Sequence, residues 1–178
     1  MARRETAARR YADAAFQIGR ADGTLEQWER DLLTLQEALG NEELRRLVQH
    51  PAVPFADKEK VLREVAAGVA REPLNLALLM VRRGRPGAID AMVERFRELV
   101  RRDRGISLAE VRTALQLDDE ERTAIAERLR ALTGTRIEMN EVVDESLIGG
   151  VSVRIGDQLY DASVRSRLER LRARLTAV

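Results

Sequence analysis

The stretch VVDESLIGGVSVRIGDQLYDASV, residues 142–164, decides how the C-terminal part of the chain folds. Across residues 151–155 apolar and polar side chains alternate, which is the pattern of a strand with one buried face. The dipeptide Gly156-Asp157 interrupts this alternation, and residues 158–162 resume it. Ser163 then precedes a basic helix whose first free amides its hydroxyl can cap. The stretch therefore predicts a strand, a turn, a second strand and a helix.

Two adjacent glycines, Gly149 and Gly150, come just before the first of these strands. A residue without a side chain tolerates a positive φ and allows another backbone segment to approach closely. We expect the pair to form a Gly-Gly hairpin between the preceding strand and the strand that starts at Val151.

The segment upstream of this stretch also mixes strand and helix patterns. Asp118 and Glu121 match a capping box, which predicts the start of a helix that ends at Gly134. Alternating residues predict a strand on each side of this helix, and leucine-spaced residues give the final helix one apolar stripe. These residues are Val111, Thr113 and Leu115; Ile137 and Met139; and Val164, Leu168, Leu171 and Leu175. Residues 106–178 are thus predicted to form a small α+β domain.

The first 105 residues show only helical periodicity. Thr24 and Gln27 match a capping box, Asn41 and Pro54 stand before further helices, and Pro73 opens a segment that is apolar nearly all round. A helix of that kind belongs in the centre of a bundle. Six helices are expected, at about residues 5–20, 24–40, 42–49, 55–69, 73–83 and 88–104. The predicted fold class is mainly α, with a six-helix bundle over residues 1–105 followed by the α+β domain.

Composition limits the chemistry that the chain can perform. It contains no cysteine, which excludes disulfides and thiolate metal sites, and no apolar run approaches the length of about 20 residues that spans a bilayer. Acidic side chains outnumber basic ones 12 to 6 in residues 105–163, whereas the helix after them carries five arginines against one glutamate. This local polarity is typical of a region that meets a charged partner or solvent.

Each possible chemical site in the sequence has a simpler interpretation. His50, the only histidine, lies beside Pro51 and has neither a cysteine nor a second histidine as partner, so we interpret it as a turn residue. The four acids at 118–121 are explained by helix capping, and Gly149-Gly150 lacks the GxxxxGK(S/T) frame of a phosphate-binding loop. We therefore expect no catalytic residues, no metal site and no cofactor.

Several stretches of the chain together resemble one known family. They are Leu147 to Val151 with the helix start Asp161-Ala162-Ser163, the N-terminal run Arg10 to Phe16, the central run His50 to Lys58, and Val81-Arg82-Arg83. This combination resembles the delta subunit of bacterial F-type ATP synthases, whose mitochondrial relative is the oligomycin-sensitivity-conferring protein. The resemblance spans the whole chain.

The resemblance implies a structural role rather than an enzymatic one. Similar proteins link the catalytic head, through the N-terminal helices of its alpha subunits, to the b-subunit stalk anchored in the membrane, so that proton-driven rotation is coupled to ATP synthesis. It implies one copy per complex at the cytoplasmic face of the bacterial membrane, with no nucleic-acid partner and no direct membrane insertion. The alternative that the residues leave open is a stand-alone helical adaptor or nucleic-acid-binding module.

The resemblance also implies which residues bind. In similar proteins the alpha-subunit helix lies on the first and fifth helices, which here bear Tyr11, Ala14, Ala15, Ile18 and Leu78. Stalk binding, or the integrity of the Gly-Gly turn on which it depends, is assigned to Leu147, Ile148, Gly149, Gly150, Asp161 and Ser163.

Overall fold

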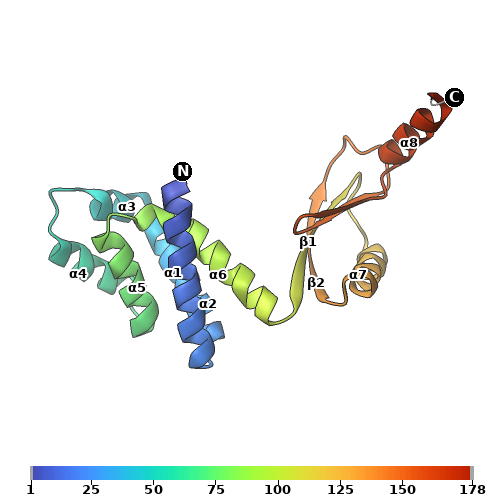
Figure 1. Ribbon diagram of the computed structural model, residues 1–178. Helices are drawn as coiled ribbons and strands as arrows, with labels where there is room; N and C mark the ends of the chain where they lie inside the picture. The colour runs from blue at the N-terminus through green and yellow to red at the C-terminus, as the bar shows by residue number, and fades with distance from the viewer. Residues whose placement is uncertain (1, 177–178) are drawn as a thin grey trace. The chain divides into compact units, whose positions relative to one another are not determined.

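The computed structural model describes residues 2–176 and divides into two compact units, residues 1–100 and 101–178. The first unit is built from helices, with one 3-10 turn before the last of them (Figure 1). They are α1 (Ala2–Ala21), α2 (Leu25–Gly40), α3 (Glu42–Gln49), α4 (Phe55–Val65), α5 (Arg71–Arg82), η1 (Pro86–Ala88) and α6 (Ile89–Asp103). The second unit combines helices with a sheet, so the predicted fold class, mainly α followed by a small α+β part, is confirmed.

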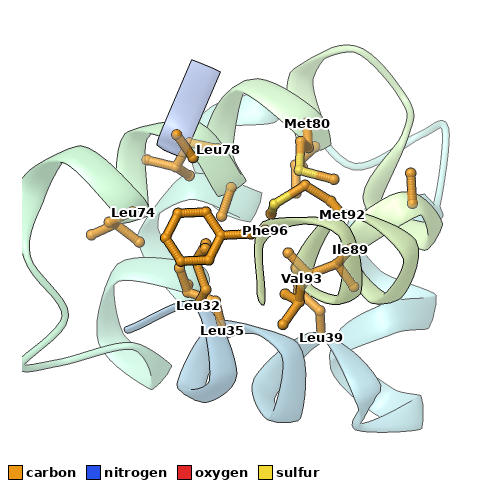
Figure 2. Packing of buried hydrophobic residues seen from close by; sticks show 14 of the residues in the cluster. Leu32, Leu35, Leu39, Leu74, Leu78, Met80, Ile89, Met92, Val93 and Phe96 are labelled. Carbon is orange, nitrogen blue, oxygen red and sulfur yellow. The ribbon is translucent and has the colours of Figure 1, made fainter. Parts of the chain in front are cut away.

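The core of the first unit is centred on Phe96 of α6, whose side chain is fully buried. Figure 2 shows its ring among apolar side chains from α2 and α5, with Leu32 and Leu78 on different sides of it. The ring of Trp28 stacks on it, with the two ring centroids 6.3 Å apart. The buried members of this core from helix α1 are small, Ala8, Ala12 and Ala15, and Tyr11 and Phe16 pack against it from the same helix while staying partly exposed. The backbone of α1 can therefore lie close to its neighbours, as its alanine-rich sequence suggests.

Asp31 of α2 is a buried carboxylate that joins two helices. Its Oδ2 accepts a hydrogen bond from the backbone N–H of Ala70 (3.0 Å), the residue that precedes α5, and its Oδ1 accepts one from Nε2 of Gln27 (2.9 Å). The capping box predicted for Thr24 and Gln27 is wrong: the Thr24 side chain makes no capping bond, and its N–H, which Gln27 would bond in a box, donates to the carbonyl of Gly19 (2.8 Å). By contrast, Oδ1 of Asn41 accepts the N–H groups of Glu43 (2.9 Å) and Leu44 and caps α3 as expected.

Helix α4 is shorter than its apolar spacing predicts. It ends at Val65, so Val69, expected on the same stripe, lies in the following loop, where Gly68 has φ +98°. The N–H of Val69 instead donates to the carbonyl of Ala66. Helix α5 buries Leu74, Ala77, Leu78, Met80 and Val81, which agrees with its predicted central position.

The second unit is a four-stranded sheet with two helices. Its elements are β1 (Ile106–Thr113), α7 (Asp119–Thr133), β2 (Arg136–Val143), β3 (Val151–Ile155), β4 (Gln158–Asp161) and α8 (Val164–Thr176). The strand order is β2-β1-β3-β4; β1 and β2 are parallel and connected through α7, and the other pairs are antiparallel. The capping box of Asp118 and Glu121 is present, and Gly134 ends α7 with φ +68°, both as predicted.

Two sequence expectations about this sheet are wrong. Gly149 and Gly150 do not form a hairpin, because β2 and β3 pair with opposite edges of β1 and the glycine segment crosses from one side of it to the other. The tight turn between adjacent strands is the one at Gly156, which has φ +57°. Leu115 is not part of β1, which starts directly after Gly105 and ends at Thr113.

The second unit has a small core. The fully buried apolar residues are Ala109, Val111, Leu129 and Val153, from β1, α7 and β3. The leucine stripe of α8 does not join this core: Leu168, Leu171 and Leu175 expose 52%, 54% and 71% of their surface. The sequence pattern correctly indicated one apolar face on this helix, but the described part of the chain leaves that face uncovered.

A fragment of residues 1–105 is expected to fold cooperatively by itself, because all six α-helices of the first unit and the core around Phe96 lie within it. Far-UV circular dichroism during thermal unfolding measures this. The fragment should keep its helical signal and lose it in one transition. A fragment without helical dichroism would show that the bundle depends on the second unit.

Candidate partner-binding surfaces

The residues assigned to alpha-subunit binding lie on neighbouring helices but differ in exposure. Ile18 exposes 46% of its surface and Ala14 is also exposed, while Tyr11 is half-buried. Ala15 and Leu78, at 1% and 6% exposed, belong to the core of the bundle. Of these residues, α1 therefore exposes Ala14, Ile18 and part of Tyr11, whereas Ala15 and Leu78 are covered by the bundle.

A second apolar surface of the first unit was not predicted from the sequence. A groove of about 600 Å³ runs between α2, α3 and α4, lined by Ala38, Leu44, Leu47, Val61 and Val65 with polar residues at its border. Val65 is 53% exposed. Its position on the apolar stripe of α4 was visible in the sequence, but periodicity alone gave no reason to separate it from the core residues of that stripe.

Gly150 occupies a position that no other residue type fits. Its φ is +80°, and a Cβ built on it would lie 2.7 Å from the carbonyl oxygen of Ala162 and 3.0 Å from Cα of Ser163. The sequence predicted a positive φ or a close backbone neighbour at the glycine pair, and Gly150 has both. The Gly149 carbonyl accepts the N–H of Val164 (2.9 Å), so the glycine segment is attached to the first residue of α8.

Ser163 and Asp161 hold the other side of this contact. The Ser163 hydroxyl accepts the N–H of Ser166 (3.2 Å), which caps α8 as predicted, and Ser163 is only 2% exposed. Oδ1 of Asp161 accepts the N–H of Ser163 (2.9 Å). Hydrogen bonds from the backbone and then from the hydroxyl of Ser163 lower the pKa of Asp161 below its ordinary value. These two residues therefore position the start of α8 and do not form a chemical site.

Asp144 fixes the first half of the loop that carries the glycines. Its Oδ1 accepts the N–H of Ser146 (3.0 Å), and Oδ2 lies 3.8 Å from a guanidinium nitrogen of Arg112 on β1. Arg165 of α8 donates to the carbonyl of Ser146 (2.8 Å) and so connects the helix to the same loop. The hydrogen bonds from Ser146 are the main reason that the pKa of Asp144 is lowered; Arg112 and Arg165 add smaller effects.

Lowering the pH is expected to remove the stabilisation that the Asp144 carboxylate gives to the glycine loop. A carboxylate whose pKa is lowered by folding stabilises the folded state above its ordinary pKa, 3.8 for Asp144, and that contribution disappears as the pH falls through the lower folded value. An Asp144→Asn variant should therefore be less stable than the parent at pH 7, and the difference should shrink steadily below pH 3.8. Urea titrations followed by backbone amide signals of β1 and β3 measure it.

Glu145→Gln is the matched control for that experiment, because Glu145 is the exposed carboxylate next in the chain and no residue among 2–176 bonds to its side chain. The control should have the stability of the parent at pH 7 and also below pH 3.8. A stability loss in Asp144→Asn that stays constant down to the lowest pH would show that Asp144 acts through its shape and not through its charge.

Leu147 and Ile148 border a wide apolar groove at one end of the sheet. The groove has a volume of about 1160 Å³ and extends over the segment after β1, the first turns of α7 and the glycine loop. Ile148 and Leu115 are among the most exposed large apolar side chains of the unit, whereas Leu147 is half-buried. Together with the uncovered stripe of α8, this groove gives the second unit two apolar surfaces next to the glycine contact.

No cluster of three or more possible metal ligands occurs in the described residues 2–176. In the same range, no helix has the length and apolar character required to cross a membrane. His50 ends α3, and its Nδ1 accepts the N–H of Ala52 (3.2 Å), which agrees with its interpretation as a turn residue. What both units do carry is exposed apolar side chains beside grooves, a kind of surface that is typical of proteins that bind other proteins.

Comparison with known proteins identifies the family. The model of the ATP synthase delta (OSCP) subunit family matches residues 7–175. The ATP synthase subunit delta of Salinibacter ruber is 37% identical over 172 residues, which cover 96% of this chain and 90% of the relative. That of Anaeromyxobacter sp. is 35% identical over 171 residues, or 94% of this chain and 96% of the relative. The chain belongs to the ATP synthase delta (OSCP) subunit family.

A solved structure agrees with this membership. A chain of the Toxoplasma gondii mitochondrial ATP synthase hexamer superimposes with a TM-score of 0.65 at 26% identity, covering 96% of this chain and 98% of that one. The protein is therefore a component of the peripheral stalk of F-type ATP synthase, and its role in ATP synthesis and ion transport is structural and not catalytic. The alternative of a stand-alone adaptor or nucleic-acid-binding module is not favoured.

Proposed function

We propose that the first unit binds the N-terminal helices of the alpha subunits and that the second unit holds the C-terminal ends of the b subunits, with one copy per complex at the cytoplasmic face of the membrane. The observation that supports this most is that family similarity covers both units, since the match runs from residue 7 to residue 175. A protein that bound only one partner would need only one of the two units.

The mechanism is mechanical. A rotating shaft changes the conformation of the head only if the head is kept from turning with it, so a connector must bind the head and the stalk at the same time. Each unit has exposed apolar surface of its own: Ile18 and Val65 on the first, and Ile148 with the α8 stripe on the second. Exposed apolar side chains that gather on one face are typical of surfaces that bind other proteins.

Charge supports the choice of the second unit for the stalk. Helix α8 presents arginines beside its uncovered leucines, so an amphipathic helix with acidic residues on its border is the complementary partner. The function of Gly149, Gly150, Asp161 and Ser163 in this proposal is to hold α8 in the orientation that such a partner meets.

Two matched substitutions test where the alpha subunit binds. Ile18 and Val65 are similarly exposed apolar residues on different surfaces of the first unit, so an aspartate at either should leave the fold intact. With a peptide of the alpha-subunit N-terminus, Ile18→Asp should weaken binding at least about tenfold, as expected when an interface loses an apolar anchor and gains an unpaired charge. Val65→Asp should bind the peptide like the parent.

Calorimetric titration of both variants gives the answer. If instead Val65→Asp weakened binding of the peptide and Ile18→Asp did not, the alpha-subunit site would lie at the groove between α2, α3 and α4. If the parent bound no alpha-subunit peptide but bound generic duplex DNA in a strongly salt-dependent manner, the nucleic-acid alternative would replace this proposal.

A further inference from the structure

The first unit contains a hollow that the proposed stalk function does not use. It has a volume of about 490 Å³ and lies where the end of α3, the start of α4, the end of α5 and the η1 turn meet. The buried residues Val48, Val81, Pro86 and Ala88 lie at its base, and polar atoms contribute more of its exposed lining than apolar atoms do. Its volume is in the range of about 300–1,000 Å³ that is typical of pockets for small molecules, and its polar lining favours a charged one.

The polar groups around this hollow are all cationic or neutral. Lys58 of α4, Arg82 of α5 and Arg85 of the following loop line it, and no carboxylate does. Within residues 2–176 none of the three makes a salt bridge, whereas Arg63, only a short distance along α4 from Lys58, pairs with Glu59 at 2.7 Å. Three cations around one concave space repel one another unless an anion joins them.

Helix electrostatics explain only part of this arrangement. Arg82 is in the last turn of α5, where the negative end of the helix dipole favours a cation. Lys58, however, is near the N-terminus of α4, where the dipole disfavours one. Helix electrostatics therefore do not account for the presence of Lys58 around the same hollow as Arg82 and Arg85.

The geometry of Arg82 suits a ligand as well. Its guanidinium carbon lies over the ring of Phe55, 5.7 Å from the ring centroid, so a cation–π contact helps to hold the side chain beside the hollow. Next to it, the backbone N–H groups of Gly84 and Arg85 donate to Val81 and Met80 and fix the turn that carries Arg85 (2.9 and 2.8 Å). The backbone from which the Arg85 side chain extends is thus held by hydrogen bonds.

We propose that this pocket binds a small soluble phosphate compound, whose phosphate oxygens are taken by the three cations. Guanidinium groups match phosphate oxygens in pairs of parallel hydrogen bonds, which is why arginine is the preferred residue for phosphates. The class fits better than a carboxylate, because a single carboxylate can engage one guanidinium in this way but not two together with an ammonium group.

The test is a titration of the full-length protein with sodium pyrophosphate, the simplest probe of this chemistry, at about 0.15 M salt so that diffuse attraction is screened. Backbone amide signals of Gly84 and Gly87 should shift and saturate. Arg85→Gln and Lys58→Gln should each weaken binding about tenfold, as expected for the loss of one hydrogen bond between charged groups.

Arg83→Gln is the matched control, because Arg83 is exposed and adjacent in sequence but does not line the hollow, and the change in net charge is the same. It should bind pyrophosphate like the parent. Equal weakening by Arg83→Gln and Arg85→Gln, or shifts that never saturate, would overturn the proposal. Binding of phosphatidic acid vesicles without any binding of pyrophosphate would also overturn it, since the ligand would then be a membrane surface.

Discussion

Gly150→Ala is expected to destabilise the second unit by about 1–3 kcal/mol from the backbone conformation alone, because alanine disfavours a φ of +80°. The steric overlap adds to this loss. The new Cβ would lie 2.7 Å from the carbonyl oxygen of Ala162, and that atom belongs to backbone held by a hydrogen bond from the N–H of Ala162 to Val151 (2.9 Å). The neighbour cannot rotate away as a side chain would, so the glycine loop and the start of α8 must separate. Gly150→Val should have a larger effect.

Gly156→Ala separates the two causes. Gly156 also has a positive φ, +57°, but a Cβ there would have no neighbour within 4 Å. Gly156→Ala should lower the free energy of unfolding only through the unfavourable φ. The additional loss of unfolding free energy in Gly150→Ala therefore measures the steric overlap with the residues at the start of α8. Urea unfolding followed by backbone amide signals of the second unit gives both values. Equal losses in the two variants would mean that Gly150 is needed only for its turn.

The same variant has a functional consequence. Because the glycine contact holds the start of α8, Gly150→Ala should weaken binding of a peptide taken from the C-terminal end of the stalk's b subunits, while binding of the alpha-subunit peptide persists. Unchanged binding of the stalk peptide would remove α8 from the proposed stalk site.

The capping motifs show what local sequence can and cannot predict. Asp118 and Glu121 form the predicted box, whereas Thr24 and Gln27, with an equally good pattern, do not. The difference lies in the residues before the helix: the Thr24 N–H donates to the carbonyl of Gly19 in the last turn of α1 (2.8 Å), and Thr24 has φ −111° and ψ 21° instead of the extended conformation of an N-cap. The tight connection from α1 thus uses the N–H that the box requires and overrides the local motif.

The glycine pair shows the same limit for a sheet. Its backbone requirements could be predicted from residue type, since only glycine allows both a positive φ and contact at that distance. Its place in the topology could not. Alternation along β3 indicates which side chains share a face but carries no information about which strand lies beside it, so the hairpin was the wrong inference.

The candidate surfaces were harder to predict than the fold, for a physical reason. An apolar stripe indicates that a helix face avoids water, but it does not say whether the chain itself or another protein covers that face. Leu35 of α2 and Leu168 of α8 both lie on the apolar stripe of a helix rich in polar and charged residues, yet Leu35 is in the core and Leu168 is exposed. The resemblance to a family supplied the partner that periodicity could not.

The central claim is that one molecule must hold the head and the stalk at once. The measurement is proton-driven ATP synthesis by membranes from which the catalytic head and this protein have been removed. Returning the head alone should not restore synthesis, although the free head continues to hydrolyse ATP. Adding the full-length protein should restore it, because the head is then kept from turning with the shaft.

The 1–105 fragment makes this measurement decisive, because it contains the proposed head-binding surface and lacks the sheet and α8. It should fail to restore synthesis and, added in excess, should compete with the full-length protein and block recovery. The account predicts recovery only when both units are present in one chain; restoration of proton-driven ATP synthesis by the fragment alone would contradict it.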